Sequence, residues 1–182
     1  MVYRSDSLLA APTVARAAAA SPLEDEVTQL FDHLRNPLLR YVLTIGLGAE
    51  DGEEVIQEVF LALFRHLESG KPRDNLRGWL FRVAHNLALK RRQKSLTDRF
   101  LEVDEQIDLR PNPEEATADR QRRQGLLAVV RALPEKDRCC LHLRAEGLRY
   151  REIAETLGIS LGAVSLCLTR ALARLKRADG AL

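Results

Sequence analysis

The chain has 182 residues, 46% of them hydrophobic and 30% charged, enough for one folded domain or two small ones. Aromatic residues make up only 5%, and alanine and leucine dominate the apolar set, which favours helices. No stretch approaches the length of a membrane-spanning helix, and cysteines at 139, 140 and 167 form no disulfide framework. We therefore expect a helical protein of the reducing cytoplasm, without a membrane segment.

The net charge is only +2, but charge alternates in four blocks. Residues 1–75 hold 7 basic and 12 acidic side chains (net −5), and residues 76–99 hold 7 and 1 (net +6). Residues 100–119 hold 1 and 7 (net −6), and residues 120–182 hold 13 and 6 (net +7). The two basic blocks predict two contacts with a polyanion, although solvated helix faces would give the same pattern.

Residues 1–22 are expected to be a disordered leader, because Asp6, Pro12 and Arg16 spoil the pattern of a secretion signal. Apolar residues at helical spacing then predict a first helix up to Ile45. Asn36-Pro37 should break or kink this helix, because the residue before a proline avoids the α conformation.

A second helix is predicted from about residue 51, with acids in its first turn and a buried apolar stripe. Residues 68–75 (ESGKPRDN) form a loop by composition. A third helix, 76–93, has an apolar stripe, to which Trp79 is assigned, and a strongly basic face, on which His85 is expected.

Residues 95–119 are predicted to be a flexible acidic linker, since they contain Pro-Asn-Pro and little periodicity. The second block, residues 120–178, begins with helical stretches that end at Pro134 and Gly147. No strand pattern occurs in the sequence. We therefore predict an all-α protein with two small helical domains, 23–94 and 120–178, on a flexible tether.

The segment from Tyr150 to Leu172 fits a helix-turn-helix, in which two short helices are joined by a tight turn. Gly158 supplies the turn at positive φ, and Ser160 is placed to cap the second helix. The buried seam of that helix is predicted at Val164, Leu168, Leu172 and Leu175.

The outward face of the second helix is poor in the side chains that usually read base edges. It consists of Ala163, Ser165, Leu166, Thr169 and Arg170, with Cys167 at the margin. Arg170 and Arg174 alone offer long cationic arms there. The flanking phosphate contacts would be Arg149, Arg151, Lys176 and Arg177. We expect recognition that depends on the DNA backbone and shape, or alternatively a protein–protein patch around Leu166 and Cys167.

Three segments in order resemble the extracytoplasmic-function group of bacterial sigma factors, the promoter-recognition subunits of RNA polymerase. They are AEDGEEVIQEVFLALFRHL, LRGWLFRVAHNLALKRRQK and LPEKDRCCLHLRAEGLRYREIAETLGIS. The resemblance covers about residues 25–177. It implies a helix-turn-helix in the C-terminal domain and, as partners, core RNA polymerase and promoter DNA. It also leaves room for an anti-sigma factor.

The resemblance assigns roles to three surfaces. An acidic and amide row would bind core polymerase: Asp51, Glu54, Gln57 and Glu58. A loop and the helix after it would bind the −10 element as a single strand: Lys71, Arg73, Asn75, Arg77, Arg82, Asn86, Lys90 and Arg91. The helix-turn-helix would bind the double-stranded −35 element: Arg149, Arg151, Ser160, Ala163, Ser165, Leu166, Thr169, Arg170 and Arg174.

No reaction chemistry, cofactor or metal is implied. Cys139-Cys140-x-His142 is not a zinc signature, because adjacent helical residues diverge by about 100°. Lys90 and the Ser165-Leu166-Cys167 triplet depart from the family pattern, which often has Asp and Lys-Ser-Arg there, so the promoter sequence stays open. The alternatives are a helix-turn-helix regulator that is not a sigma factor, and a sigma-like protein that acts through protein–protein contacts.

Overall fold

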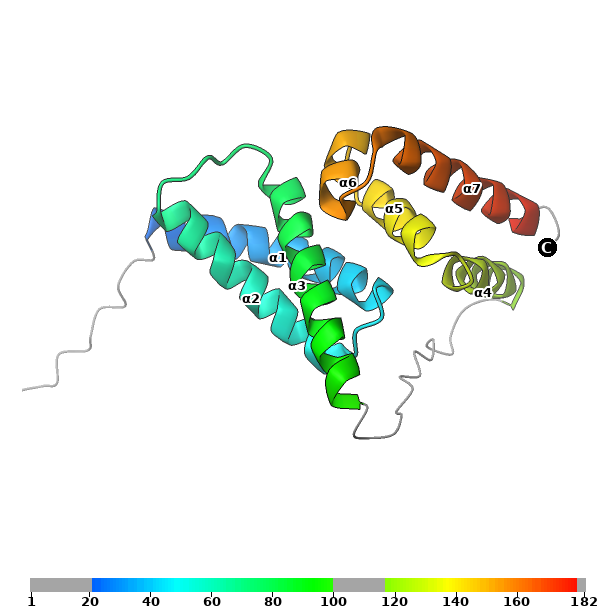
Figure 1. Ribbon diagram of the computed structural model, residues 1–182, viewed down its shortest axis with the longest axis horizontal. Coiled ribbons are helices and arrows are strands. Elements are labelled where there is room, and N and C mark those ends of the chain that lie inside the picture. The colour runs from blue at the N-terminus through cyan, green and yellow to red at the C-terminus, as the bar shows by residue number, and fades with distance from the viewer. Residues whose placement is uncertain (1–20, 100–116, 180–182) are drawn as a thin grey trace, which may run out of the picture.

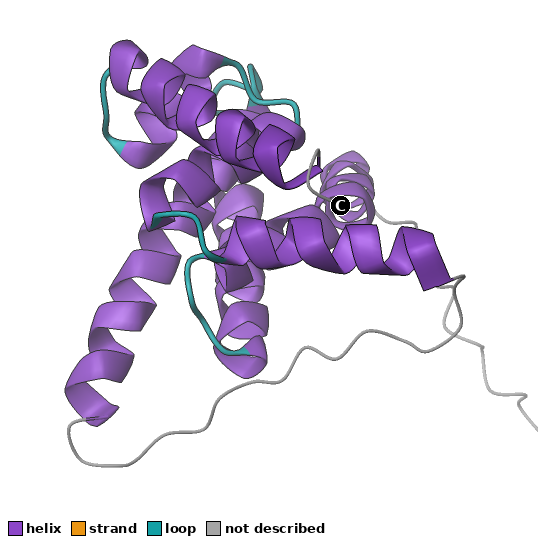
Figure 2. Ribbon diagram, turned by 90° about the vertical axis from the view of Figure 1, so that its right-hand side faces the viewer, coloured by secondary structure: helices purple, strands orange, loops and turns teal. Residues whose placement is uncertain are grey.

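The computed structural model describes residues 21–99 and 117–179, and every regular element in these ranges is an α-helix (Figures 1 and 2). The helices are α1 (Pro22–Thr44), α2 (Ala49–Glu68), α3 (Leu76–Arg99), α4 (Thr117–Arg131), α5 (Glu135–Ala145), α6 (Tyr150–Leu157) and α7 (Leu161–Asp179). The predicted all-α class is confirmed. Within the described ranges no single helix is long and apolar enough to cross a membrane, and only α6 and α7 taken as one pair, bent by 102°, meet that criterion.

Helices α1, α2 and α3 form the N-terminal body. A capping box starts α1, in which the Glu24 amide donates to Ser21 Oγ and the Ser21 amide donates to the Glu24 carboxylate. Gly52 lets α1 and α2 approach closely, because a Cβ at that position would lie 3.1 Å from Cδ1 of Leu39. The start of α1 and its close approach to α2 therefore depend on single residues that the sequence shows.

Helices α4 to α7 form the C-terminal body and contain the predicted helix-turn-helix. Gly158 ends α6 with φ of 63°, a conformation that residues with a side chain rarely adopt. Ser160 Oγ then accepts a hydrogen bond of 3.2 Å from the Ala163 amide at the start of α7. Both predicted turn features are confirmed.

The two bodies contact each other directly as well as through the intervening chain. Helix α6 lies beside α3, and α5 contacts α1 (Figure 1). Buried side chains of both bodies form one apolar cluster, and the ring of Tyr41 on α1 lies 5.6 Å from the ring of His142 on α5. We call this contact the seam. Sequence periodicity identified the apolar faces but not the second body that covers them.

Helix α1 continues through Pro37 and is not broken at Asn36-Pro37 as predicted. A proline inside a helix costs about 3 kcal/mol. Leu34 and Leu38, on the turns around it, are both buried, and each buried leucine contributes about 1.5–3 kcal/mol. Packing against α2 and α3 therefore offsets the lost backbone hydrogen bond.

The boundaries of two predicted segments also differ from those in the structure. Helix α3 extends to Arg99, beyond residue 93, and α4 already begins at Thr117, so helix occupies both ends of the predicted 95–119 linker. Residues 100–116 lie outside the described residues. Ser21 and Pro22, assigned to the leader, are the cap and first residue of α1, and residues 1–20 lie outside the described residues.

Three burial predictions were wrong. His85 is buried on α3, where its Nδ1 lies 2.9 Å from the Tyr41 hydroxyl. Cys167 is buried in the C-terminal body, whereas Leu172 is 48% exposed. Ala171 takes the place of Leu172 in the buried stripe of α7, because two helical turns at 3.6 residues each favour the spacing 164, 168, 171.

Candidate functional site

The acidic face of α2 is partly neutralised within the N-terminal body. Arg91 of α3 donates to Asp51 at 2.8 Å and also bonds Glu54. Gln57 and Glu58 are exposed, and no hydrogen bond or ion pair holds them within the described residues. Leu61, one turn beyond Gln57, is 50% exposed and extends the same face, although the sequence reasoning missed it. Glutamine, glutamate and leucine here offer a protein partner polar and apolar contact together.

The loop between α2 and α3 is held by its own side chains. Asn75 has φ of 54°, and its Oδ1 accepts a hydrogen bond from the Gly78 amide, which caps α3. Trp79 stacks near His66 at 4.6 Å between ring centroids, and His66 Nε2 lies 2.9 Å from the Pro72 carbonyl. Trp79 is only partly buried, and it also lines a cavity.

The basic residues predicted for the −10 element are divided by the seam. Lys71, Asn86 and Lys90 are exposed, and Arg73 pairs with Glu26 at 3.2 Å on the far side of the loop. Arg77 and Arg82, in contrast, pair with acids of the C-terminal body. We call these loop and α3 residues the cationic strip; in sequence order it is exposed toward its two ends, and Arg77 and Arg82 in its middle are paired with the C-terminal body.

Glu146, at the end of α5, is the centre of the ion pairs across the seam. Its carboxylate accepts from Arg40 and from Arg77, both at 3.1 Å, and its carbonyl accepts from Arg77 Nε at 2.9 Å. His142 Nε2 lies 3.8 Å from the same carboxylate. Further along the seam, Arg92 donates to Glu135 at 2.9 Å. These charged contacts add to the apolar cluster that buried side chains of both bodies form.

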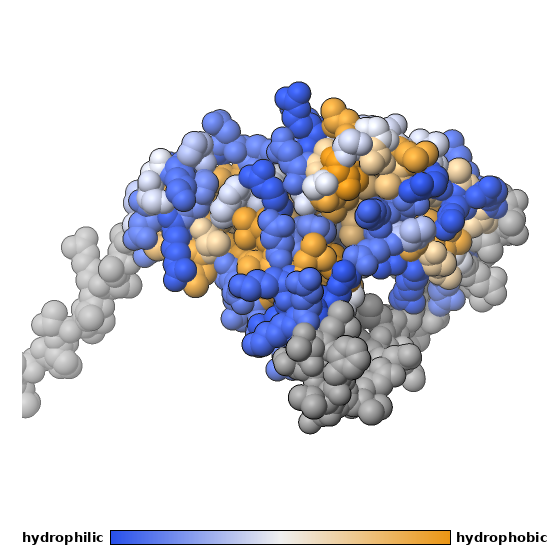
Figure 3. All heavy atoms as spheres, in the orientation of Figure 1, coloured by the Kyte–Doolittle hydropathy of each residue, from blue (hydrophilic) through white to orange (hydrophobic). Residues whose placement is uncertain are grey.

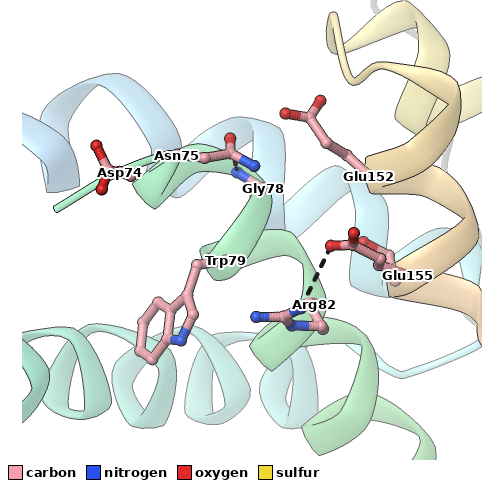
Figure 4. A pocket seen from close by; sticks show the side chains of 8 residues that line it. Asp74, Asn75, Gly78, Trp79, Arg82, Glu152 and Glu155 are labelled. Carbon is pink, nitrogen blue, oxygen red and sulfur yellow. Dashed lines mark hydrogen bonds and ion pairs between the residues drawn. The ribbon is translucent and has the colours of Figure 1, made fainter. Parts of the chain in front are cut away.

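A cavity of about 210 Å³ lies between the start of α3 and α6 (Figure 4). Asn75 and Gly78 line the α3 side, and Glu152 and Glu155 line the α6 side, where Arg82 forms an ion pair of 3.5 Å with Glu155. The cavity thus places acids of the C-terminal body opposite the predicted −10 residues.

The helix-turn-helix exposes most of the residues predicted to contact the −35 element. Figure 3 shows apolar side chains gathered over α6 and α7, and the exposed large ones there include Tyr150, Leu161 and Leu166. Ala163 is partly buried, and Ser160 Oγ is occupied as the cap of α7. The exposed predicted residues are Arg149, Arg151, Ser165, Leu166, Thr169, Arg170 and Arg174.

Arg170 is held by an acid that the sequence analysis did not identify. Asp137, in the first turn of α5, is 0% exposed and accepts from Arg170 Nε at 3.1 Å and from Nη2 at 2.6 Å. Burial raises the pKa of Asp137, but the hydrogen bonds from Arg170 and Cys167 outweigh it and lower the pKa below its usual value. No periodicity distinguishes Asp137 from a solvated acid at a helix start, so the sequence carried no signal for it.

The buried histidines and cysteines near the seam and in the C-terminal body are uncharged at neutral pH. Burial lowers the pKa of His85 and of His142 and raises the pKa of Cys139 to about 11 and of Cys140 to about 12. The three cysteines are free and buried, and their thiols stay protonated. These groups contribute to packing.

Two family models match the sequence, one in each body. Sigma-70 region 2 matches residues 30–96, and Sigma-70, region 4 matches residues 123–175. The ECF RNA polymerase sigma factor SigE of Mycolicibacterium smegmatis is 32% identical over 151 residues, which is 80% of this chain and 57% of SigE. The chain belongs to the ECF group of sigma-70 factors. A helix-turn-helix regulator of another class is not favoured, because region 2 would have no place in it.

Other relatives of this ECF sigma factor extend the comparison. RNA polymerase sigma factor YlaC of Bacillus subtilis is 25% identical over 158 residues, 84% of this chain and 91% of YlaC. The fold resembles CnrH in its complex with the cytosolic domain of CnrY (TM-score 0.57, 24% identity, 86% of this chain and 89% of CnrH). It also resembles RpoE of Bartonella quintana in complex with the anti-sigma factor NepR (TM-score 0.62, 18% identity, 85% and 96%).

Proposed function

We propose that this chain binds core RNA polymerase and directs it to promoters, where it contacts the −35 element as a duplex and the −10 element as a single strand. The family membership supports this role, and the observation that carries it is the pairing of an exposed polar row on α2 with a cationic strip on α3. The chain itself catalyses no reaction in this proposal, because the polymerase forms the RNA. We infer that it acts in the cytoplasm, where polymerase and promoters are found.

Core polymerase would dock on the exposed face of α2. Gln57 and Glu58 are available, and Leu61 gives the face an apolar centre. Asp51 and Glu54 would join them if Arg91 turned away to bind DNA, so the same movement would expose acids for the polymerase and a cation for the promoter.

Binding of the −10 strand requires the two bodies to separate. Arg77 and Arg82 lie on the cationic strip, and in the closed arrangement their charges are satisfied by Glu146 and Glu155. DNA phosphates would replace these carboxylates after opening. Asn75, at the rim of the cavity, is placed to hydrogen-bond an unpaired base, and the exposed cations Lys71 and Lys90 extend the strip on either side.

The −35 duplex would be bound by α7, with its exposed residues Ser165, Leu166 and Thr169 in the major groove. Arg149 and Arg151, at the start of α6, would contact phosphates and fix the orientation. An anti-sigma factor as a regulator is part of the proposal only by analogy, since the two similar structures are named as complexes of that kind.

The docking assignment is tested by co-purification of the full chain with core polymerase. A double variant, Gln57→Ala with Glu58→Lys, should weaken core binding about tenfold or more, equivalent to about 1.4 kcal/mol. Glu68→Lys is the matched control, because it makes the same charge change at an exposed position at the end of α2. Wild-type affinity in the double variant, with a folded chain by circular dichroism, would reject α2 as the docking helix.

A further inference from the structure

The ion pair between Asp137 and Arg170 has an unusual division of exposure. Asp137 is entirely buried at the start of α5, whereas the side chain of Arg170 on α7 is 49% exposed. The carboxylate accepts from Nε and Nη2, the side edge of the guanidinium group. At the end edge, formed by Nη1 and Nη2, Nη1 donates to no partner among the described residues, and beyond Asp137 Nη2 donates only to the sulfur of Cys167, a weak acceptor.

The surroundings of the pair leave the guanidinium group little freedom. Nη2 also lies 3.5 Å from Cys167 Sγ, a buried neutral thiol. Two parallel hydrogen bonds to a carboxylate define both the position and the plane of an arginine, which a single contact does not. Because Asp137 cannot reach water, it cannot exchange Arg170 for solvent without a large desolvation cost.

Arg170 lies on the exposed face of α7 that is proposed to contact DNA. Thr169 and Leu166 are its exposed neighbours, one residue and one turn away. A guanidinium end edge matches a pair of acceptors, either O6 and N7 of guanine or two oxygens of one phosphate. Of the arginines proposed for this face, Arg149, Arg151 and Arg174 have no carboxylate bonded to their guanidinium groups among the described residues.

We propose that Asp137 is a positioning residue for promoter recognition: it holds Arg170 so that the end edge of its guanidinium group meets a pair of acceptors on the −35 duplex. The proposal rests on the proposed function. Asp137 itself would not contact DNA, so its effect on DNA binding would be exerted only through Arg170.

The test uses the full chain bound to core polymerase and a pool of promoter duplexes randomised upstream of a fixed −10 element. Asp137→Asn keeps the side-chain shape and removes the charge. It should lower the selectivity or the affinity at least about threefold, whereas Arg170→Lys, which lacks the planar fork, should lose about 5- to 150-fold, equivalent to about 1–3 kcal/mol. Asp179→Asn is the matched control, because Asp179 also holds an arginine in two hydrogen bonds, at 2.7 and 2.9 Å from Arg122.

A double-mutant cycle separates positioning from a merely structural role. If Asp137 acts through Arg170, Asp137→Asn adds less than about twofold in the Arg170→Lys background. Loss of preference at one base pair identifies guanine as the acceptor, and an equal loss on all sequences identifies phosphate; both support positioning. Full additivity, or wild-type DNA binding by Asp137→Asn, overturns it.

Folding and the proposed function are checked in the same preparations. Core binding and the circular dichroism melt should stay near those of the Asp179→Asn control. If Asp137→Asn does not fold, Arg170→Lys decides, because it keeps a cation beside the buried carboxylate; unchanged binding by that variant rejects the proposal. A wild-type chain that fails to bind core polymerase would instead reject the proposed function.

Discussion

Replacing Glu146 should open the seam by a measurable amount. Its side chain is 15% exposed, while its partners Arg40 and Arg77 are 59% and 45% exposed, so solvent screens both ion pairs. Each such pair contributes about 0.2–1 kcal/mol. Two pairs therefore contribute about 0.4–2 kcal/mol, which corresponds to a change of about 2- to 30-fold in the ratio of open to closed chains.

The assay is binding of a fluorescent single-stranded DNA to the full chain, in a sequence taken from a promoter that the chain uses. Since only open chains would bind the covered part of the strip, the apparent affinity should rise with the open fraction. Glu146→Gln should improve affinity within the 2- to 30-fold range, and Glu146→Lys should exceed it because repulsion is added. Asp32→Asn on α1 removes the same charge from an exposed position away from the seam and should have little effect.

A charge effect without opening is excluded by small-angle X-ray scattering. Opening increases the radius of gyration, whereas removal of a carboxylate beside Arg77 does not. If Glu146→Gln binds DNA no better than Asp32→Asn, or binds better with no change in the radius, the covered strip is not what limits binding.

Two further predictions concern stability. Because burial lowers the pKa of His142 below its ordinary value of 6.5, the unfolded chain binds the proton more readily. This contribution to stability is complete above pH 6.5 and is lost as the pH falls toward the lower folded-state pKa. The midpoint of thermal melts should therefore decrease from pH 7.5 to pH 5.5, and the decrease should be smaller in the His142→Gln variant. Gly52→Val places branched carbons where an ideal Cβ would lie 3.1 Å from Leu39 Cδ1. The variant should lower the free energy of unfolding in urea titrations by about 1–3 kcal/mol. An unchanged midpoint would show that α1 can shift away from residue 52 without loss of stability.

Local features of the sequence predicted most of the helices because the physics that forms them is local. The apolar stripe of α2, the positive φ at Gly158 and the cap at Ser160 each depend on a few neighbouring residues. Pro37 shows the limit of that reasoning. Its local penalty was read correctly, but burial of residues on either side, which depends on two other helices, decided the outcome.

The site was predictable as a set of surfaces but not as a set of partners. The charge pattern indicated a cationic strip on α3, yet His85 within it is buried against Tyr41, a contact 44 residues away in sequence. The pairing of Arg77 with Glu146 and of Arg170 with Asp137 depends on tertiary placement that no helical period encodes. The family resemblance assigned roles to the surfaces, and the structure identified the acids that pair with their arginines.

The central claim, that the chain selects promoters for RNA polymerase, is tested most directly by transcription from a purified system. The full chain, core polymerase and fragmented genomic DNA are incubated with nucleotides, and the 5′ ends of the RNA are mapped. The account predicts discrete start sites that appear only with the chain and share two upstream sequence elements. Stable binding to core polymerase without any chain-dependent start sites would contradict it and would point to a sigma-like protein that acts through protein contacts.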